Sequence, residues 1–427
     1  MADMMLLGGR VFADGTFTKR DLFVSGDAFA AAPQPGAAAV SLSALSVLPG
    51  FADVHVHLRE PGFSYKETMK TGTRAAARGG YTAVCAMPNL SPAPDCPAGL
   101  EAELAAIRRD ACVRVIPYGT ITRGERGETL SDMEALAPCV AAFSDDGRGV
   151  QSESLMRAAM ERAKRLGRLI AAHCEDETLL RSGYIHDGAY ARAHGHRGIC
   201  SESEWGQIKR DLALVRETGC AYHVCHVSAK ESVALIREAK REGLDVSCET
   251  APHYLLLDDS ELEEDGRFKM NPPVRDKADR EALLAGVLDG TIDMIATDHA
   301  PHTAEEKSRG LAGSAMGIVG LETAFPLLYT YLVKPGILPL SLLLEKLSAA
   351  PRRRFGLGEV TLETGGRADF SVWDLEREYA IDPAEFQSMG RATPFAGRKV
   401  YGRCLLTVCG GRVVWNEGLH MNTEDTI

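Results

Sequence analysis

The sequence predicts an α/β protein, a (β/α)8 TIM barrel with a small β-sandwich domain formed by both termini. Two observations indicate the barrel. Eight short apolar runs alternate with amphipathic helical segments, and no G-x-G-x-x-G turn of an open nucleotide-binding sheet follows the first run. A third observation indicates the β domain, because both ends of the chain consist of short strand-like segments joined by turns. The expected limits are 1–50 and 356–427 for the β domain and 51–355 for the barrel.

The eight predicted barrel strands are apolar without strict alternation, as expected of strands buried on both faces. They lie at residues 47–57, 81–89, 113–121, 139–147, 168–176, 221–228, 245–254 and 292–301. The helical segments between them include 66–80, 98–110, 152–167 and 230–243. In the last of these, Val233, Ile236 and Ala239 recur at helical spacing, and a glycine follows the final turn, which is a common helix stop.

The terminal segments differ from the middle of the chain. Strands are expected at 6–12, 20–26 and 368–375, and a hairpin is expected where Gly410-Gly411 separates two β-rich runs. Neither terminal segment is large enough to bury a core alone, so the two are expected to combine.

Composition excludes several classes of protein. The chain has 427 residues, is 45% hydrophobic and 25% charged, and has a net charge of −11, which is typical of a globular protein. It has no long Lys/Arg run, so we expect neither nucleic-acid nor anionic-membrane binding. The first ten residues lack the basic segment of a secretory signal, and prolines interrupt the longest uncharged stretch. The eleven cysteines are scattered without a CxxC pair, so we expect a cytoplasmic protein with reduced thiols.

Polar residues with metal-binding side chains fall at the ends of five predicted strands. The C-terminal ends of barrel strands converge on one mouth, so these residues are expected to meet there. A single histidine at a strand end is usually structural, but that explanation would have to hold separately at each strand. Imidazoles together with carboxylates suit one or two divalent metals, with zinc favoured. The candidates are His55, His57, His173, His226, Asp298 and one of Asp145 and Asp146.

Seven motifs then show a family resemblance. DVHVHLREPG, AMPN, FSDDG, AHCED, HVCHVS, KMNPPVR and ATDHAPH together resemble the dihydroorotase family of the amidohydrolase superfamily, in its longer bacterial class I form. The resemblance spans essentially the whole chain. It implies a metal-dependent barrel and a zinc-dependent cyclic amidohydrolase, a hydrolase acting on C–N bonds. The implied reaction is the reversible cyclisation of N-carbamoyl-L-aspartate to (S)-dihydroorotate in de novo pyrimidine (UMP) biosynthesis.

The resemblance also implies roles for the candidate ligands. One or two Zn²⁺ ions per subunit are expected, the more buried one held by His55, His57 and Asp298, the second by His173 and His226. The chain has no lysine at the end of the fourth strand, where many superfamily members have a bridging carboxylated lysine. The family's spacing points to Asp146 as the bridge, with Asp145 in a supporting role. Asp298 is the expected catalytic residue, acting as general base and then as general acid.

The substrate carboxylate is expected to bind Arg59, because a guanidinium can bind a carboxylate through two parallel hydrogen bonds. The alternative for Arg59 is a surface ion pair with Glu60. The resemblance adds Asn89 and His302 at the carboxylate, Asn271 at the ring amide, and a glycine-rich loop containing Met316 and Gly317, where relatives tend to have an aromatic residue in place of Met316. The predicted substrate-binding residues are therefore His57, Arg59, Asn89, Asn271, His302, Met316 and Gly317.

Two other functions compete with this assignment. One is another cyclic amidohydrolase, such as a hydantoinase or an allantoinase; these usually have the bridging lysine and lack the Arg59, Asn89 and His302 set. The other is a non-catalytic relative that acts as a partner of aspartate carbamoyltransferase, but such proteins usually lose metal ligands. A homodimer is also expected, and association with aspartate carbamoyltransferase is allowed.

Overall fold

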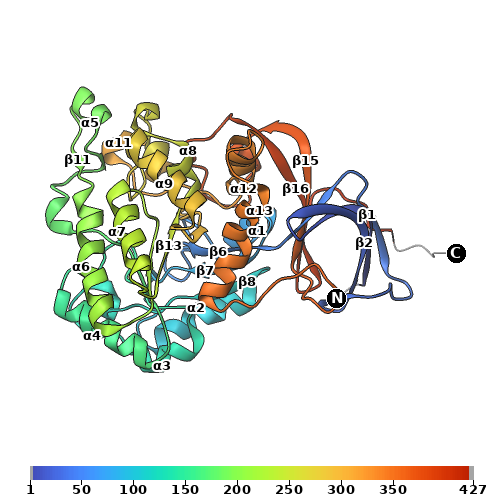
Figure 1. The fold of residues 1–427 in the computed structure, drawn as a ribbon, viewed down its shortest axis with the longest axis horizontal. Coiled ribbons are helices and arrows are strands. Elements are labelled where there is room, and N and C mark those ends of the chain that lie inside the picture. Colours follow the sequence, from blue (N-terminus) through green and yellow to red (C-terminus); the bar gives the residue numbers. More distant parts are fainter. Residues whose placement is uncertain (1–2, 423–427) are drawn as a thin grey trace.

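Two sheets of parallel strands form the centre of the larger part of the molecule. The computed structural model describes residues 3–422 (Figure 1). One sheet has the order β6-β7-β8 and the other β14-β13-β12-β9, and all neighbouring pairs are parallel. The strands are β6 (Phe51–Val56), β7 (Tyr81–Ala86), β8 (Arg114–Pro117), β9 (Ile170–Ala172), β12 (Tyr222–Val224), β13 (Val246–Thr250) and β14 (Met294–Ile295).

Single bridges join these two sheets into a barrel. Within the described residues, the fourth predicted run (139–147) forms no strand; Phe143 alone makes one parallel bridge to Gly119 and another to Ile170. On the opposite side, β6 forms one parallel bridge with the segment that follows β14. Seven of the eight predicted runs therefore contain strands, and the fourth closes the ring with one residue.

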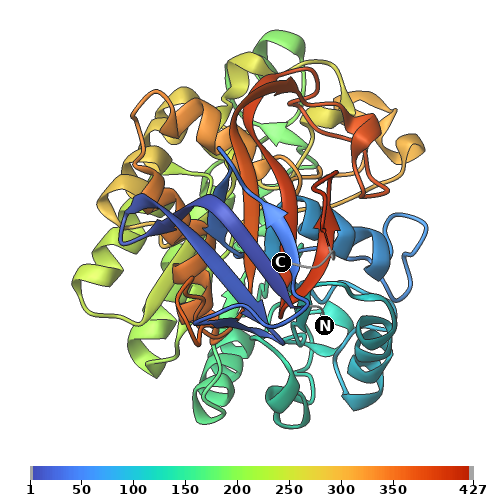
Figure 2. The same cartoon turned by 90° about the vertical axis from the view of Figure 1, so that its right-hand side faces the viewer.

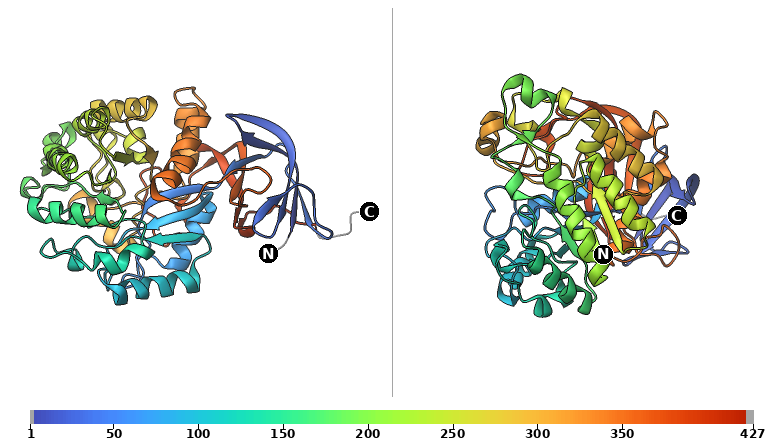
Figure 3. Two further views of the ribbon diagram at one scale, coloured as in Figure 1. Left: turned by 60° about the horizontal axis from the view of Figure 1, so that its bottom comes forward. Right: turned by 60° about the vertical axis from the view of Figure 1, so that its left-hand side comes forward.

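Helices follow the strands and surround them (Figure 3). In α7, Val233, Ile236 and Ala239 are buried, as their spacing predicted. The helices are α1 (Met69–Arg78), α2 (Pro97–Asp110), α3 (Met133–Leu136), α4 (Glu153–Arg165), α5 (Ala189–His194), α6 (Glu202–Thr218), α7 (Lys230–Arg241), α8 (Pro252–Leu256), α9 (Lys277–Asp289), α10 (Ala304–Lys307), α11 (Gly310–Gly313), α12 (Ala324–Leu328), α13 (Leu340–Leu344) and α14 (Ala350–Phe355). No helix among residues 3–422 is both long enough and apolar enough to cross a membrane.

Strands from both ends of the chain combine in one sheet, which lies beside the barrel (Figures 1 and 2). Its order is β17-β16-β15-β5-β1-β2-β3, with β4 on β1, so the predicted sandwich takes the form of one continuous sheet that covers its own apolar core. The predicted hairpin at Gly410-Gly411 joins β16 to β17. The strands are β1 (Met4–Ala13), β2 (Thr16–Ser25), β3 (Ala28–Ala30), β4 (Ala38–Ser41), β5 (Ser46–Pro49), β15 (Phe370–Ala380), β16 (Lys399–Cys409) and β17 (Arg412–Asn416).

An aromatic cluster connects this sheet to the barrel. Trp373 of β15 is almost completely buried, with its ring 5.7 Å from that of Phe51 in β6 and 4.4 Å from that of Phe325 in α12. Burial of such large apolar side chains stabilises contact between the two parts. The domain limits at residues 50 and 355 stay predictions, and residues 1–2 and 423–427 of the predicted β domain lie outside the described part of the chain.

Candidate active site

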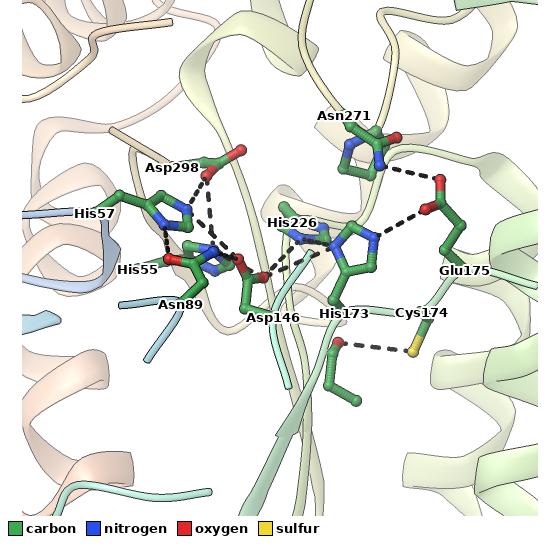
Figure 4. A network of polar contacts seen from close by, with 12 residues as sticks. His55, His57, Asn89, Asp146, His173, Cys174, Glu175, His226, Asn271 and Asp298 are labelled. Atoms are coloured by element: carbon green, nitrogen blue, oxygen red, sulfur yellow. Dashed lines mark hydrogen bonds and ion pairs between the residues drawn. The ribbon is translucent and has the colours of Figure 1, made fainter. Parts of the chain in front are cut away.

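The first barrel strand brings two histidines to the mouth of the barrel. His55 is in β6 and His57 follows its end, and residues two apart on an extended chain point to the same side. Both approach the Asp146 carboxylate: His55 Nε2 lies 3.3 Å from Oδ1 and His57 Nε2 lies 3.5 Å from Oδ2. Figure 4 shows these side chains around Asp146.

A second pair of histidines reaches Asp146 from the other side of the barrel. His173 follows β9 and His226 follows β12, and the two rings meet with His173 Nδ1 2.9 Å from His226 Nε2. These two nitrogens lie 3.7 and 3.6 Å from Asp146 Oδ1 (Figure 4). Asp146 therefore lies between the two pairs of histidines.

Asp298, after the last barrel strand, completes the group. Its Oδ1 atom lies 3.2 Å from His57 Nε2 and 3.6 Å from His55 Nε2. Burial raises the pKa of the Asp298 carboxyl group, but a hydrogen bond from His57 and the charge of His55 outweigh burial and lower that pKa. The backbone at Asp298 has a φ of 48°, a left-handed conformation that costs a non-glycine residue free energy and is common at functional sites.

The arrangement fits a metal. Among the described residues, Asp146 Oδ1 and His55 Nε2 are buried and lack a hydrogen-bond partner, which would be costly if nothing bound them. Asp145 is turned away, because its Oδ1 atom accepts hydrogen bonds from the backbone amides of Ile121 and Thr122 at 2.7 and 3.0 Å. Within residues 3–422, four sets have one potential ligand atom per residue within 4.8 Å of the others. Two of them lie around Asp146: His55, His57 and Asp146; and Asp146, His173 and His226.

A cavity of about 220 Å³ opens above these groups. Every site residue predicted from the sequence lines it except His55, which is completely buried. The lining residues are His57, Arg59, Asn89, Asp146, Gly147, His173, His226, Asn271, Asp298, Ala300, His302, Met316 and Gly317.

Arg59 lies in the wall of this cavity and has few partners. Its Nε donates to the carbonyl oxygen of Pro301 at 3.3 Å, and its Nη2 lies 3.4 Å from His302 Nε2. The alternative ion pair with Glu60 does not form among the described residues, because Glu60 instead accepts from Arg109 at 2.9 Å. Burial lowers the pKa of the Arg59 guanidinium, so an anion in the cavity would stabilise the charged side chain.

The other predicted substrate contacts surround the same space. Asn89 Oδ1 lies 2.9 Å from His57 Nδ1, and Asn271 Nδ2 donates to Glu175 at 3.0 Å (Figure 4). His302 Nε2 lies 2.8 Å from the carbonyl oxygen of Met316.

Glycine is required at position 317. Its φ is 131°, and a Cβ atom there would lie 2.7 Å from the carbonyl oxygen of Ala300. The backbone of this loop can therefore approach the cavity closely. Met316, beside it, lines the cavity with a side chain as well.

Sequence comparison identifies the family. The model of the family described as "Dihydro-orotase-like" matches residues 45–232. The dihydroorotase of Geobacillus thermodenitrificans is 53% identical over 374 residues, which cover 87% of this chain and 87% of that protein. The chain belongs to the dihydroorotase family. The dihydroorotase of Bacillus cereus is 51% identical, again with 87% of each protein covered.

Solved structures confirm the predicted fold of this dihydroorotase family member. The L-hydantoinase (dihydropyrimidinase) from Arthrobacter aurescens superposes with a TM-score of 0.86 at 26% identity, over 98% of this chain and 97% of that one. The dihydropyrimidinase from Brevibacillus agri gives a TM-score of 0.85 at 22% identity, over 97% and 95%. The fold is that of the cyclic amidohydrolases.

Two carboxylates that support the site were not singled out from the sequence. Glu249 accepts hydrogen bonds from His55 Nδ1 at 2.7 Å and from His223 Nε2 at 3.1 Å. The first of these orients the His55 ring. Burial raises the pKa of Glu249, but the hydrogen bonds from His223 and His55 outweigh it and lower that pKa strongly. Glu175 similarly contacts His173 Nε2 at 3.4 Å. Glu249 ends a barrel strand, so the strand-end argument could have found it.

Proposed function

We propose that this chain is a dihydroorotase that interconverts N-carbamoyl-L-aspartate and (S)-dihydroorotate in pyrimidine (UMP) biosynthesis. The observation that supports this best is the position of Arg59. Its guanidinium lines the cavity beside the candidate metal ligands, and no carboxylate among residues 3–422 pairs with it within 4.0 Å. The carboxylate of either substrate would be a matched partner. Asn89 and His302 line the same cavity, and His302 Nε2 lies 3.4 Å from Arg59 Nη2.

Zinc, as one or two ions per subunit, is the cofactor that we propose. The imidazole-rich set of donors favours it, and the buried atoms without partners support a metal here. Bound zinc would supply a more acidic water and positive charge for the amide oxygen. We assign His55, His57 and Asp298 to one ion, His173 and His226 to the other, and Asp146 to the position between them.

Asp298 is the residue that we assign to proton transfer. Its carboxylate lines the cavity and lies 3.2 Å from His57 Nε2, and at neutral pH it is deprotonated, the form that can accept a proton. In hydrolysis it would take a proton from the attacking water and give it to the leaving ring nitrogen. Cyclisation uses the same steps in reverse. Arg59 and Asn271, at separate positions in the cavity wall, would hold the substrate carboxylate and the ring amide during this transfer.

The competing function is that of a hydantoinase, because hydantoinases share the fold. Uncharged cyclic amides would leave the Arg59 guanidinium buried without an anion, which is unfavourable. Hydantoinases usually have a bridging lysine at the position where this chain has Asp146, which also argues against a hydantoinase function. A non-catalytic partner of aspartate carbamoyltransferase is disfavoured, because all the candidate ligands are present: the four histidines gather around Asp146, and Asp298 lies beside His55 and His57.

The test compares dihydroorotate, hydantoin and allantoin as substrates, with metal content measured on the same samples. We expect turnover of dihydroorotate to exceed turnover of the other two, and we expect activity to fall on chelation and return with zinc. Full activity in folded, metal-free protein would contradict the zinc assignment. Preference for hydantoin or allantoin would contradict the substrate assignment.

Location and assembly complete the proposal. All eleven cysteines lie within residues 3–422 and are free thiols, which supports a reducing, cytoplasmic environment. Homodimer formation and association with aspartate carbamoyltransferase stay predictions from the family resemblance.

A further inference from the structure

Lys307, the last residue of α10, has an unusual environment for a lysine. Its side chain is buried, and its ammonium group donates three hydrogen bonds to backbone carbonyl oxygens. Nζ lies 2.9 Å from the oxygen of Lys269, 2.8 Å from that of Ala315 and 2.7 Å from that of Gly317. A lysine has three N–H donors, so this one is fully used.

The three carbonyl groups belong to two segments that wall the cavity. Ala315 and Gly317 flank Met316, and both Met316 and Gly317 line the cavity. Lys269 lies two residues before Asn271, which lines it from another side. The carbonyl oxygen of Lys269 also accepts from the Gly317 amide at 3.0 Å. Lys307 therefore bonds to both segments at the point where they meet.

Two further contacts hold the same loop. His302 Nε2 lies 2.8 Å from the carbonyl oxygen of Met316, so three successive carbonyl groups of the loop have side-chain partners. The Lys269 ammonium donates to the carbonyl oxygen of Ala312 at 2.9 Å, which holds the short helix α11 that leads into the loop. The loop is thus fixed by side chains outside it.

Burial of an ammonium group is unfavourable, and here it is accompanied by hydrogen bonds to three backbone carbonyl groups. Burial, together with the nearby charge of Lys269, lowers the pKa of Lys307 to about 7. A methionine would fill a similar volume without desolvating a charge, so packing alone does not account for a lysine. What a methionine could not do is hold three carbonyl oxygens around one point.

We propose that Lys307 is a positioning residue: its ammonium group sets the backbone of Met316 and Gly317 against the Asn271 segment, and so shapes the part of the cavity that receives the substrate ring. This inference rests on the proposed function for its choice of substrate. Lys307 does not line the cavity itself, so its effect would be transmitted through the loop.

The experiment uses the full-length metal-loaded protein and the variants Lys307→Met and Lys307→Gln. Lys277→Met is the matched control, because that lysine is exposed and its only ion-pair partner among the described residues is Glu281, 3.7 Å away. We expect Lys307→Met to raise KM for dihydroorotate by about tenfold or more, because misplaced hydrogen-bonding groups weaken binding, with a smaller change in kcat. Lys307→Gln, which keeps two donors, should have an intermediate KM. Metal content and the kinetics of the control should match the unaltered protein.

A second measurement does not depend on activity. Hydrogen exchange of the Gly317 amide should accelerate by about tenfold in Lys307→Gln and stay unchanged in the control, because the loop loses a fixed partner. An unchanged KM with only a lower unfolding temperature would overturn the proposal and leave Lys307 a merely stabilising residue. If Lys307→Met fails to fold, the proposal can still be tested with Lys307→Gln. An unchanged exchange rate of the Gly317 amide in that variant would overturn the proposal. Failure of the proposed function would look different, since the unaltered protein would then be inactive on dihydroorotate.

Discussion

Replacement of Arg59 by methionine tests the substrate assignment most directly. Within residues 3–422, Arg59 has two polar contacts, at 3.3 Å to Pro301 and 3.4 Å to His302, and neither partner is an anion. Bound dihydroorotate would add a charged pair in a buried setting. Truncation of one partner of such a pair costs about 2–5 kcal/mol, which corresponds to roughly a 30-fold to 4,000-fold loss in kcat/KM. Methionine keeps most of the apolar volume, so the cavity wall should persist.

The assay measures kcat/KM for dihydroorotate and for dihydrouracil, which lacks the carboxylate. Arg59→Met should lose activity on dihydroorotate by the factor above and change little on dihydrouracil. Bound zinc should stay the same, because Arg59 is not among the candidate ligands. Arg216→Met is the control, because Arg216 is an exposed residue that pairs with Glu242. Equal losses on both substrates, or a preference of the unaltered protein for dihydrouracil, would refute the reasoning.

Three further predictions concern the metal, the proton and the loop. Glu249→Gln should weaken zinc affinity by about 10–100-fold, because the hydrogen bond that orients His55 changes; unchanged affinity in a chelator titration would contradict this. Asp298→Asn should keep the fold and lower kcat by about 10²–10⁴, and near-normal turnover would mean that another group moves the proton. Gly317→Ala should reduce kcat/KM for dihydroorotate, because its methyl group would lie 2.7 Å from the Ala300 carbonyl oxygen; unchanged steady-state kinetics would show that the loop adjusts freely.

The alternation of apolar runs and helical segments was sufficient to predict the barrel, because buried parallel strands must be apolar throughout. It failed in detail at the fourth run. There the backbone pairs with the neighbouring strands only around Phe143, and beyond this short ladder the Asp145 side chain, rather than a backbone carbonyl group, accepts hydrogen bonds from the amides of Ile121 and Thr122. A pattern of apolar residues does not reveal that substitution.

The candidate site was predictable to the extent that its residues end strands. His55, His173 and Asp298 stand out for this reason, and the structure places them together. Glu249 also ends a strand, but a single glutamate among apolar residues gives a weak signal. Lys307 gives none, because its partners are backbone carbonyl groups, which every residue has.

The pairing of β5 with β15 has a consequence for how the protein is made. Pro49 lies opposite Phe370, so the two partners are separated by about 320 residues of chain. At ordinary rates of synthesis, β5 leaves the ribosome roughly 15 to 65 seconds before β15 is made. During that interval the edge of β5 that β15 will cover has no partner, and unpaired strand edges favour aggregation. A chaperone that binds extended apolar segments would protect the nascent chain most usefully at this strand, until the last part of the sheet arrives.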